Sequence, residues 1–582
     1  MFNVEIFIFL FFFLQYCIFT ISSVFIKRYL SSKHLAFYFA FSCGLLTFSL
    51  LLVAKQIYLD SQSWTYSFDN LVRGLDYIEL NFSFCVDSLS LSFALLVSVI
   101  GTATNIYTLN YFRGEGDESR FLFWLNSFVL SMITLVFSGN FFTIFLGWEL
   151  IGLSSFFLIN FWHTRRGVVK SSFKAMTFNL VSDILLLSSF VSFFLVSKTS
   201  NCGIFLNLLI LESIPKSSLL WFGTMTLVGC ASIKSVQIVG HLWLPDSMEA
   251  PVPASSLIHS ATLVSAGIYL LCRFNVLLVT CGCVPILITI GSITAAYGGV
   301  VAAAQTDMKK LLAYSTMSHC GFLWILASCG NLWITITYLY LHGLFKAATF
   351  YCAGSFIRNY NTQDTRWMGS GAKFLRLDSF LLIFCGANLA GLPFSIGVLY
   401  KLYFFKLILL WSISWWQIGL MFIGLASSLV YYYRLTNYAI FDFYKGSKLF
   451  PGYSILFTKI DLTDYRSTTS NHLLAVCILV FAALVTTYAM WWCINNNLIA
   501  WETIHEELST ILVDRAKVEI IYTNYYILFY TLYFVIFIML CVVVCRPNIF
   551  AVESILTLLI LVIFFGFLSV RCEVILWQKL IQ

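Results

Sequence analysis

Long apolar runs follow one another along almost the whole chain, and they constrain the fold more than any other feature. A helix needs a run of about 20 apolar residues to cross a bilayer. Within the hydrocarbon it also pairs its own backbone polar groups, which an isolated strand cannot do. The sequence therefore predicts an all-α polytopic membrane protein with about sixteen transmembrane helices. The apolar runs cover residues 2–26, 35–54, 86–109, 120–138, 140–162, 172–197, 218–240, 254–274, 284–304, 311–328, 331–356, 376–408, 411–433, 471–494, 522–545 and 550–571.

The composition excludes a soluble multi-domain enzyme. Of the 582 residues, 60% are hydrophobic and only 10% are charged, whereas a water-facing surface needs roughly a quarter of its residues charged. Most of the surface must therefore contact membrane lipids. The net charge of +7 has no clustered basic face, so we expect no nucleic-acid partner. The 17 cysteines lie mostly singly in apolar runs without a CxxC motif, and we expect no metal site.

The distribution of Lys and Arg between alternate loops predicts the orientation. One set of loops carries roughly twenty basic residues and the other about seven, and such a bias marks the inner side of a membrane. The first apolar run has no basic segment before it and no small-residue cleavage site, so we interpret it as a permanent span. The N-terminus is then expected on the outer side.

Three segments are predicted to lie outside the spans. Residues 55–85 combine acidic residues with aromatic ones and predict a surface hairpin, and residues 434–470 predict a polar loop. Residues 501–519 place apolar side chains at helical spacing with acidic residues opposite, which predicts an amphipathic helix at the membrane interface.

A few ionisable residues fall inside the predicted spans. Because a charge at mid-membrane costs several kcal/mol, each of them is a candidate functional residue. The set consists of Glu149, Asp183, Lys234, His259, His319, His342, Lys346 and Lys401.

Lys234 and Glu149 are the strongest candidates, because each lies between apolar residues well inside a run. A nearby carboxylate stabilises a buried ammonium, so a moving carboxylate would switch the lysine between holding and releasing a proton. A lysine reaching out from a span end is the structural alternative for Lys234, and a residue at a helix end is the alternative for Glu149. Asp183 fits a structural ion pair as well as a proton carrier.

Three histidines and a second lysine extend this set. His259 titrates near neutral pH, which suits a proton relay, although a core histidine bonded to a carbonyl fits equally. His342 and Lys346 are four residues apart and share one helix face, so we expect them in a common hydrated interior. His319 fits a polar filler of the core.

Two stretches place a lysine beside a predicted helix break. Lys234 precedes Pro245, Pro251 and Pro253, and Lys401 follows the sequence LAGLPFSIGVLY. Broken helices expose backbone groups that hold water or ions, so two such stretches predict a two-part transport path and indicate an internal duplication.

Four motifs carry a resemblance to a known family. They are HLWLPDSMEAPVPASSLIHSATLVSAGIYLL (241–271), QTDMKKLLAYSTMSHCGF (305–322), GWELIGLSSFFLINFW (147–162) and HGLFKAATFYCAGS (342–355). Together they closely resemble the antiporter-like membrane subunits of respiratory complex I, and most of all the distal one. The resemblance covers about residues 80–410.

The resemblance implies a proton-translocating role without a redox centre in this chain. Flavin, iron-sulfur clusters and ubiquinone are expected in other subunits, and the partners are other membrane-arm subunits, especially the adjacent antiporter-like one. The resemblance also implies an ion pair between Glu149 and Lys234. A hydrated axis for protons would continue from this pair through His259 and end at Lys401. His342 and Lys346 would extend that axis. Asp183 and the pair of Asp307 with Lys309 match further polar positions of the family.

The family also implies a location and a domain organisation. The location is the mitochondrial inner membrane, with basic loops in the matrix and the N-terminus in the intermembrane space. We expect N-terminal spans and the hairpin in residues 1–110, an antiporter-like core with inverted repeats and broken helices in 111–435, and C-terminal spans with a lateral amphipathic helix and a final span in 436–582. If 522–545 belongs to the lateral helix, the chain has about fifteen spans.

Three positions depart from the family pattern. Leu402 follows Lys401 where the family usually has an acid, Tyr338 stands where many members have a second histidine, and Leu180 replaces an arginine near Asp183. Two other functions fit the same motifs: the large subunit of a multisubunit cation/proton antiporter, and a structural membrane subunit that has lost transport.

Overall fold

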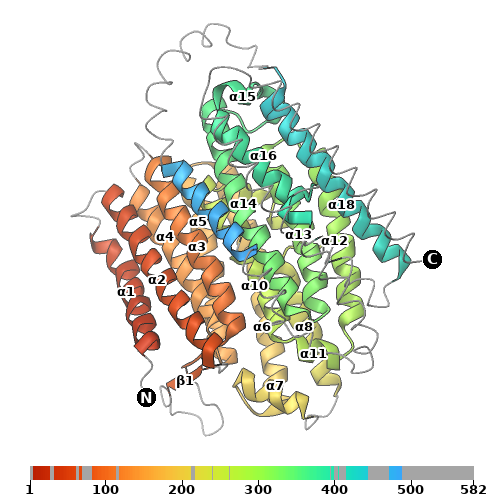
Figure 1. Cartoon of the computed structure of the whole chain (residues 1–582). Coiled ribbons are helices and arrows are strands. Elements are labelled where there is room, and N and C mark those ends of the chain that lie inside the picture. Colours follow the sequence, from red (N-terminus) through yellow and green to blue (C-terminus); the bar gives the residue numbers. More distant parts are fainter. Residues whose placement is uncertain are drawn as a thin grey trace.

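The computed structural model of the chain is a bundle of long helices that run side by side (Figure 1). It describes residues 4–26, 32–60, 64–68, 82–112, 117–211, 217–238, 240–260, 262–392, 395–398, 401, 404, 414–443 and 471–487. The long helices are α1 (Val4–Ile26), α2 (Ser32–Asp60), α3 (Ser88–Tyr111), α4 (Glu118–Val136), α5 (Phe141–Ile159), α6 (Arg166–Ser197), α8 (Ser218–Lys234), α12 (Val284–Ala304), α13 (Met308–Ser328), α14 (Leu332–Tyr360), α16 (Arg376–Ala390) and α18 (Trp415–Thr436).

Shorter elements connect these helices. Two consecutive helices, α9 (Val252–Ser260) and α10 (Leu263–Arg273), together have the length of one span. The other short elements are α7 (Cys202–Ile210), α11 (Asn275–Thr280), α15 (Gly371–Phe374), the 3-10 helices η1 (Asn160–Trp162), η2 (His241–Trp243), η3 (Asp246–Glu249) and η4 (Thr365–Trp367), the π-helical η5 (Asn437–Phe441), and the strands β1 (Trp64–Phe68) and β2 (Phe82–Val86).

The prediction of a helical membrane protein is confirmed. Within the described ranges, nine segments are long and apolar enough to cross a membrane, and three shorter apolar helices accompany them, at 8–23, 218–234 and 471–487. The predicted amphipathic helix 501–519 and the predicted spans 522–545 and 550–571 lie outside the described residues, so the count of sixteen stays a prediction. The predicted loop 434–470 is described only to residue 443. Its first residues are helical, because α18 and η5 continue to Phe441.

Close packing in the middle of the bundle depends on small residues. A Cβ atom added to Gly321 of α13 would lie 2.7 Å from the backbone nitrogen of Ala295 on α12, and one added to Gly298 of α12 would lie 2.8 Å from that of Ser318 on α13. Small residues at such contacts let two helix backbones approach closely. The result is that α13 is almost wholly enclosed by protein, with 94% of its most apolar stretch buried.

The predicted surface hairpin is confirmed at both of its strands. β1 and β2 pair antiparallel, with Trp64 opposite Val86, although α2 continues through the first residues of the predicted segment to Asp60. Directly after β2, Asp87 begins α3 by accepting a hydrogen bond from the Ser90 backbone N–H at 2.8 Å. The same carboxylate forms an ion pair with Arg273 at the end of α10, so it joins the hairpin to the bundle.

The first helix break comes earlier than the prolines suggest. The predicted span 218–240 ends as a helix at Lys234, and Val236 then takes a positive φ of 59°, which is strained for a β-branched residue. Side chains satisfy backbone groups that the break leaves: the indole N–H of Trp243 donates to the Ile233 carbonyl at 3.0 Å. The amide of Gln237 binds Thr294 of α12 through its oxygen at 2.7 Å.

The second break interrupts the predicted span 376–408. α16 ends at Ala390, and Gly391 has a φ of +69°, a left-handed conformation that glycine adopts without strain. A Cβ atom at Gly391 would lie 2.7 Å from Cδ of Lys401. Gly391 therefore both turns the chain and makes room for the stem of the lysine.

Substitution of Gly391 by alanine should destabilise the protein. A left-handed conformation costs a non-glycine residue roughly 1 kcal/mol, and the added methyl group would also displace Lys401. We expect a lower thermal unfolding temperature for Gly391→Ala in the purified protein. Gly44→Ala is the matched control, because Gly44 lies in α2 with nothing within 4 Å of an added Cβ, and unfolding of this control at a temperature as low as that of Gly391→Ala would contradict the account.

The Asp87–Arg273 pair provides a second test. Asp87→Asn keeps an oxygen for capping α3 but leaves the guanidinium of Arg273, which is 11% exposed, without its counter-charge. Loss of one partner from a largely buried pair typically costs about 3 kcal/mol, so thermal unfolding should shift clearly downward. Asp117→Asn, which removes the exposed pair with Arg120, should leave the unfolding temperature nearly unchanged, and equal shifts in the two variants would refute this interpretation.

Candidate functional site: a buried row of polar residues

Lys234 is the most enclosed charged residue of the site. It is the last residue of α8, its side chain is 0% exposed, and its Nζ has no hydrogen-bond partner among the residues that the structure describes. The ammonium lies 5.2 Å from the ring centre of Trp148 on α5, a cation–π contact. A Cβ atom at Gly152 would lie 3.4 Å from Nζ, so the glycine leaves space for the head of the lysine. The position excludes a lysine that reaches out to solvent.

Two carboxylates act on Lys234 through their charge, and neither touches it. Asp183 on α6 is buried and Glu149 on α5 is half-buried, and in the described part of the chain neither forms an ion pair with Lys234 at 4.0 Å or less. Asp183 has the stronger electrostatic effect on the lysine and Glu149 the weaker. The predicted Glu149–Lys234 pair is therefore one part of a group of three.

A short hydrogen-bonded chain holds Asp183 in place. The Ser182 hydroxyl donates to its carboxylate at 3.1 Å, and the indole N–H of Trp148 donates to Ser182 at 3.4 Å. Trp148 thus contacts the lysine with its ring and reaches the carboxylate through Ser182. The neighbouring Leu180, which replaces the family's arginine, is exposed on the outside of α6.

His259 lies at the end of α9, next to the break between α9 and α10. Its side chain is 0% exposed. Its Nε2 is 3.1 Å from the Ser247 hydroxyl, and its Nδ1 has no partner. The charge that acts on His259 is that of Lys346. Its hydrogen bond is therefore to a side-chain hydroxyl and not to a backbone carbonyl.

His342 and Lys346 lie on one face of α14, as the spacing predicts. Lys346 is buried and donates from Nζ to the Ser315 hydroxyl of α13 at 2.6 Å. Neither ring nitrogen of His342 has a hydrogen-bond partner. The centre of its ring lies 5.1 Å from that of His319 on α13.

His319 belongs to the same group of polar residues. Its Nδ1 is 2.8 Å from the hydroxyl of Tyr338, and its Nε2 is 3.5 Å from the hydroxyl of Tyr431 on α18. Tyr338 occupies the position of the family's second histidine, so the departure places a phenol against His319. The charges of His342, Lys346 and Lys401 all act on this ring.

Lys401 forms a hydrogen bond with the end of α16 at the second helix break. Its Nζ donates to the carbonyl of Ala390, the last residue of α16, at 2.5 Å and to the Ser428 hydroxyl of α18 at 3.1 Å. The broken helix thus supplies an acceptor for the ammonium. Leu402, the departure next to Lys401, lies outside the described residues.

Asp307 and Lys309 lie apart from this row. Asp307 begins α13 and pairs with Lys310 at 3.7 Å. Lys309 is buried and donates to the carbonyls of Ala250 at 3.1 Å and Met248 at 3.4 Å. Lys309 therefore binds the segment between η3 and α9. α9 in turn carries His259 near its C-terminal end.

The site residues form two groups, joined within each group by charge or hydrogen bonds. The first consists of Glu149, Asp183 and Lys234, and the second of His259, His319, His342, Lys346 and Lys401. Among the described residues no hydrogen bond or ion pair links Lys234 to His259, and the segment after the first break lies between them in the chain. Sequence reasoning missed Gln237, Ser315 and Tyr431, which are uncharged and give no signal without their neighbours.

Comparisons with known proteins identify the family and the fold. A family model described as "NADH:quinone oxidoreductase/Mrp antiporter, TM" matches residues 138–430, and one described as "NADH-Ubiquinone oxidoreductase (complex I), chain 5 N-terminus" matches residues 74–122. A chain in the structure of the Mrp complex from Dietzia sp. has a similar fold, with a TM-score of 0.66, 21% sequence identity and coverage of 88% of this chain and 59% of that one.

Two relatives carry the name NADH-ubiquinone oxidoreductase chain 5. The protein of Paramecium tetraurelia is 38% identical over 503 residues, which are 82% of this chain and 85% of the relative. That of Acanthamoeba castellanii is 37% identical over 330 residues, which are 55% of this chain and 49% of the relative. The chain therefore belongs to the antiporter-like membrane subunits of complex I, the family of NADH-ubiquinone oxidoreductase chain 5.

Proposed function

We propose that the chain is a proton-translocating membrane-arm subunit of respiratory complex I, and that its two groups of buried polar residues carry the proton. The observation that supports this most is the enclosure of Lys234 and Lys346 with no carboxylate of the described residues at ion-pair distance. Charges kept at such cost inside a membrane protein mark ion and proton pathways. Electron transfer, with flavin, iron-sulfur clusters and ubiquinone, belongs in this proposal to other subunits.

The carboxylates set the protonation of Lys234 in this mechanism. Asp183 and Glu149 favour the ammonium when they are close and charged, and burial disfavours it when they are not. A proton released from Lys234 must cross the segment of the first break to reach His259. Water is the natural carrier there, because broken helices at membrane depth line hydrated cavities.

The second group takes the proton onward. The charge of Lys346 acts on both His259 and His319, and that of Lys401 also acts on His319. The unpartnered nitrogens of His259 and His342 leave positions for water or for a transferred proton. Exit near Lys401 then uses the Ala390 carbonyl, Ser428 and water, since residue 402 is a leucine.

The ends of the bundle support an inner-membrane orientation. β1 and α7 lie at one end of the molecule and α15 at the opposite end (Figure 1), and α15 belongs to a loop rich in Lys and Arg. We place the α15 end in the matrix and the β1 end, with the N-terminus, in the intermembrane space.

Other membrane-arm subunits, including the adjacent antiporter-like one, are the proposed partners. A cation/proton antiporter is the second candidate, favoured by the family model whose description also names the Mrp antiporter.

Removal of the Lys234 ammonium should stop pumping without stopping assembly. Because Nζ makes no hydrogen bond with the described residues, Lys234→Ala removes the charge without breaking a hydrogen bond, and we expect coupled NADH oxidation and proton pumping to fall by at least about tenfold. Both rates are measured in proteoliposomes that hold the assembled complex. Lys310→Ala, on a half-exposed residue at a helix start, should pump normally, and normal rates in assembled Lys234→Ala would disprove the relay.

The two carboxylates should substitute for each other in part. Since both act on the same ammonium, Asp183→Asn or Glu149→Gln alone should reduce the pumping rate, and the double variant should reduce it far more than the product of the single effects. Asp246→Asn, which removes the exposed pair with Lys174, serves as the control. If one single variant abolishes pumping and the other has no effect, only one carboxylate acts on Lys234. That result would contradict the proposal that Glu149 and Asp183 both set its protonation.

A further inference from the structure

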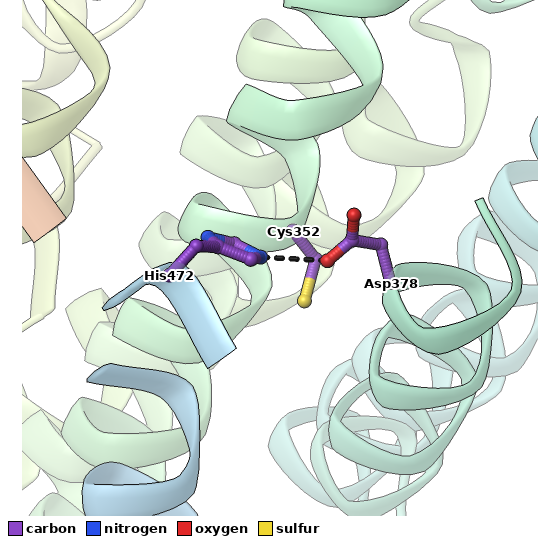
Figure 2. Close-up of side chains that lie close together, drawn as sticks. All are labelled: Cys352, Asp378 and His472. Atoms are coloured by element: carbon purple, nitrogen blue, oxygen red, sulfur yellow. Dashed lines mark hydrogen bonds and ion pairs between the residues drawn. The ribbon is translucent and has the colours of Figure 1, made fainter. Parts of the chain in front are cut away.

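Cys352, Asp378 and His472 meet at a second buried cluster, outside the row of polar residues (Figure 2). They come from three elements: α14, α16 and the helix 471–487. Their donor atoms, Sγ, a carboxylate oxygen and a ring nitrogen, all lie within 4.8 Å of one another. Nε2 of His472 is 2.6 Å from Oδ1 of Asp378. All three side chains are buried.

The cluster lies near the end of the bundle that carries the basic loop. Asp378 is in the first turn of α16, and His472 is the second residue of its helix. Cys352 lies eight residues before the end of α14 at Tyr360, which is about 12 Å along a helix. The three side chains therefore join the ends of two helices to the side of a third.

The hydrogen bond between His472 and Asp378 explains why these two polar side chains can be buried together. It leaves the Cys352 thiol unexplained, with its sulfur close enough to the Asp378 carboxylate for the two to interact by charge. It also leaves Nδ1 of His472 buried without a partner. A thiolate, an imidazole and a carboxylate are together the donor set that zinc binds in proteins.

We propose that Cys352, Asp378 and His472 bind a divalent transition-metal ion of the zinc class. The charges favour it, because a thiolate and a carboxylate neutralise a divalent cation and a neutral imidazole completes the set, so no net charge is buried. The three donor atoms lie within 4.8 Å of one another, whereas ligands at zinc bond lengths in a tetrahedral site lie about 3.3–3.6 Å apart. Nε2 of His472 and Oδ1 of Asp378, which are 2.6 Å apart, would therefore separate when the ion binds.

Binding is ligand exchange without electron transfer. The ion loses water, the Cys352 thiol loses its proton to solvent, and three donor bonds form, with the fourth position left for water. The ion would fasten the helix 471–487, which follows the polar loop, to the core of the bundle. This role is separate from proton transfer along the row of polar residues.

Two nearby cysteines provide matched comparisons. Cys385 on α16 and Cys477 on the helix 471–487 lie near Cys352, but neither belongs to the group of donors within 4.8 Å. Cys385 is buried as deeply as Cys352. Cys385→Ser therefore removes a thiol from the same helix interface without removing a proposed ligand.

The experiment measures zinc per purified, assembled complex by elemental mass spectrometry after chelation and reloading with zinc alone. We expect one zinc fewer per complex in Cys352→Ser and His472→Gln, and an unchanged content in Cys385→Ser. In His472→Cys the new thiol is a zinc ligand, so the zinc should be retained although the hydrogen bond to Asp378 is altered. Equal zinc contents in all variants, or a loss in Cys385→Ser equal to that in Cys352→Ser, would overturn the proposal.

If His472→Gln does not assemble, assembly itself becomes the measurement. His472→Cys should then assemble when zinc is supplied and fail when a chelator removes it. Assembly of His472→Cys that is independent of zinc would show a structural contact only and would overturn the metal site.

Discussion

A lysine ammonium enclosed by helices without a hydrogen bond is the constraint on which the rest of the structure depends. Keeping Lys234 inside a membrane costs several kcal/mol on the mildest scales, and the surrounding elements offset part of that cost. α8 ends at the lysine, the ring of Trp148 faces its charge, and Asp183 stabilises it from α6 without touching it. A charge held in this way responds strongly to small movements of its neighbours.

The helix break next to Lys234 connects this constraint to the fold. Val236 turns the chain with a positive φ, and the side chains of Trp243 and Gln237 donate to the carbonyls of Ile233 and Ser235 at the turn. The helices around the break are packed through glycines, so the core has little freedom to absorb a shift. Movement next to the break is therefore confined mainly to side chains.

Hydropathy alone predicted the helical class, most of the spans and the buried ionisable residues, because a charge in an apolar run stands out. The break at Lys234 was predicted from prolines, but it occurs ahead of them, at Val236. The short helix α7 was missed, whereas α16 ends at Gly391 inside the second stretch that was predicted to break. Partners such as Ser315, Tyr431 and Gln237 depend on which helices pack together, and an uncharged side chain carries no sign of this in the sequence.

Lys346 gives the most direct test of a proton path through this chain, since its hydrogen bond is to a serine hydroxyl and it lies among three histidines of the second group. The decisive measurement is the number of protons moved per NADH oxidised by the complex in proteoliposomes, for the wild type and for Lys346→Met. The account predicts that the variant assembles and pumps far fewer protons, with NADH oxidation slowed as well. An assembled variant with the wild-type ratio and rate would contradict it.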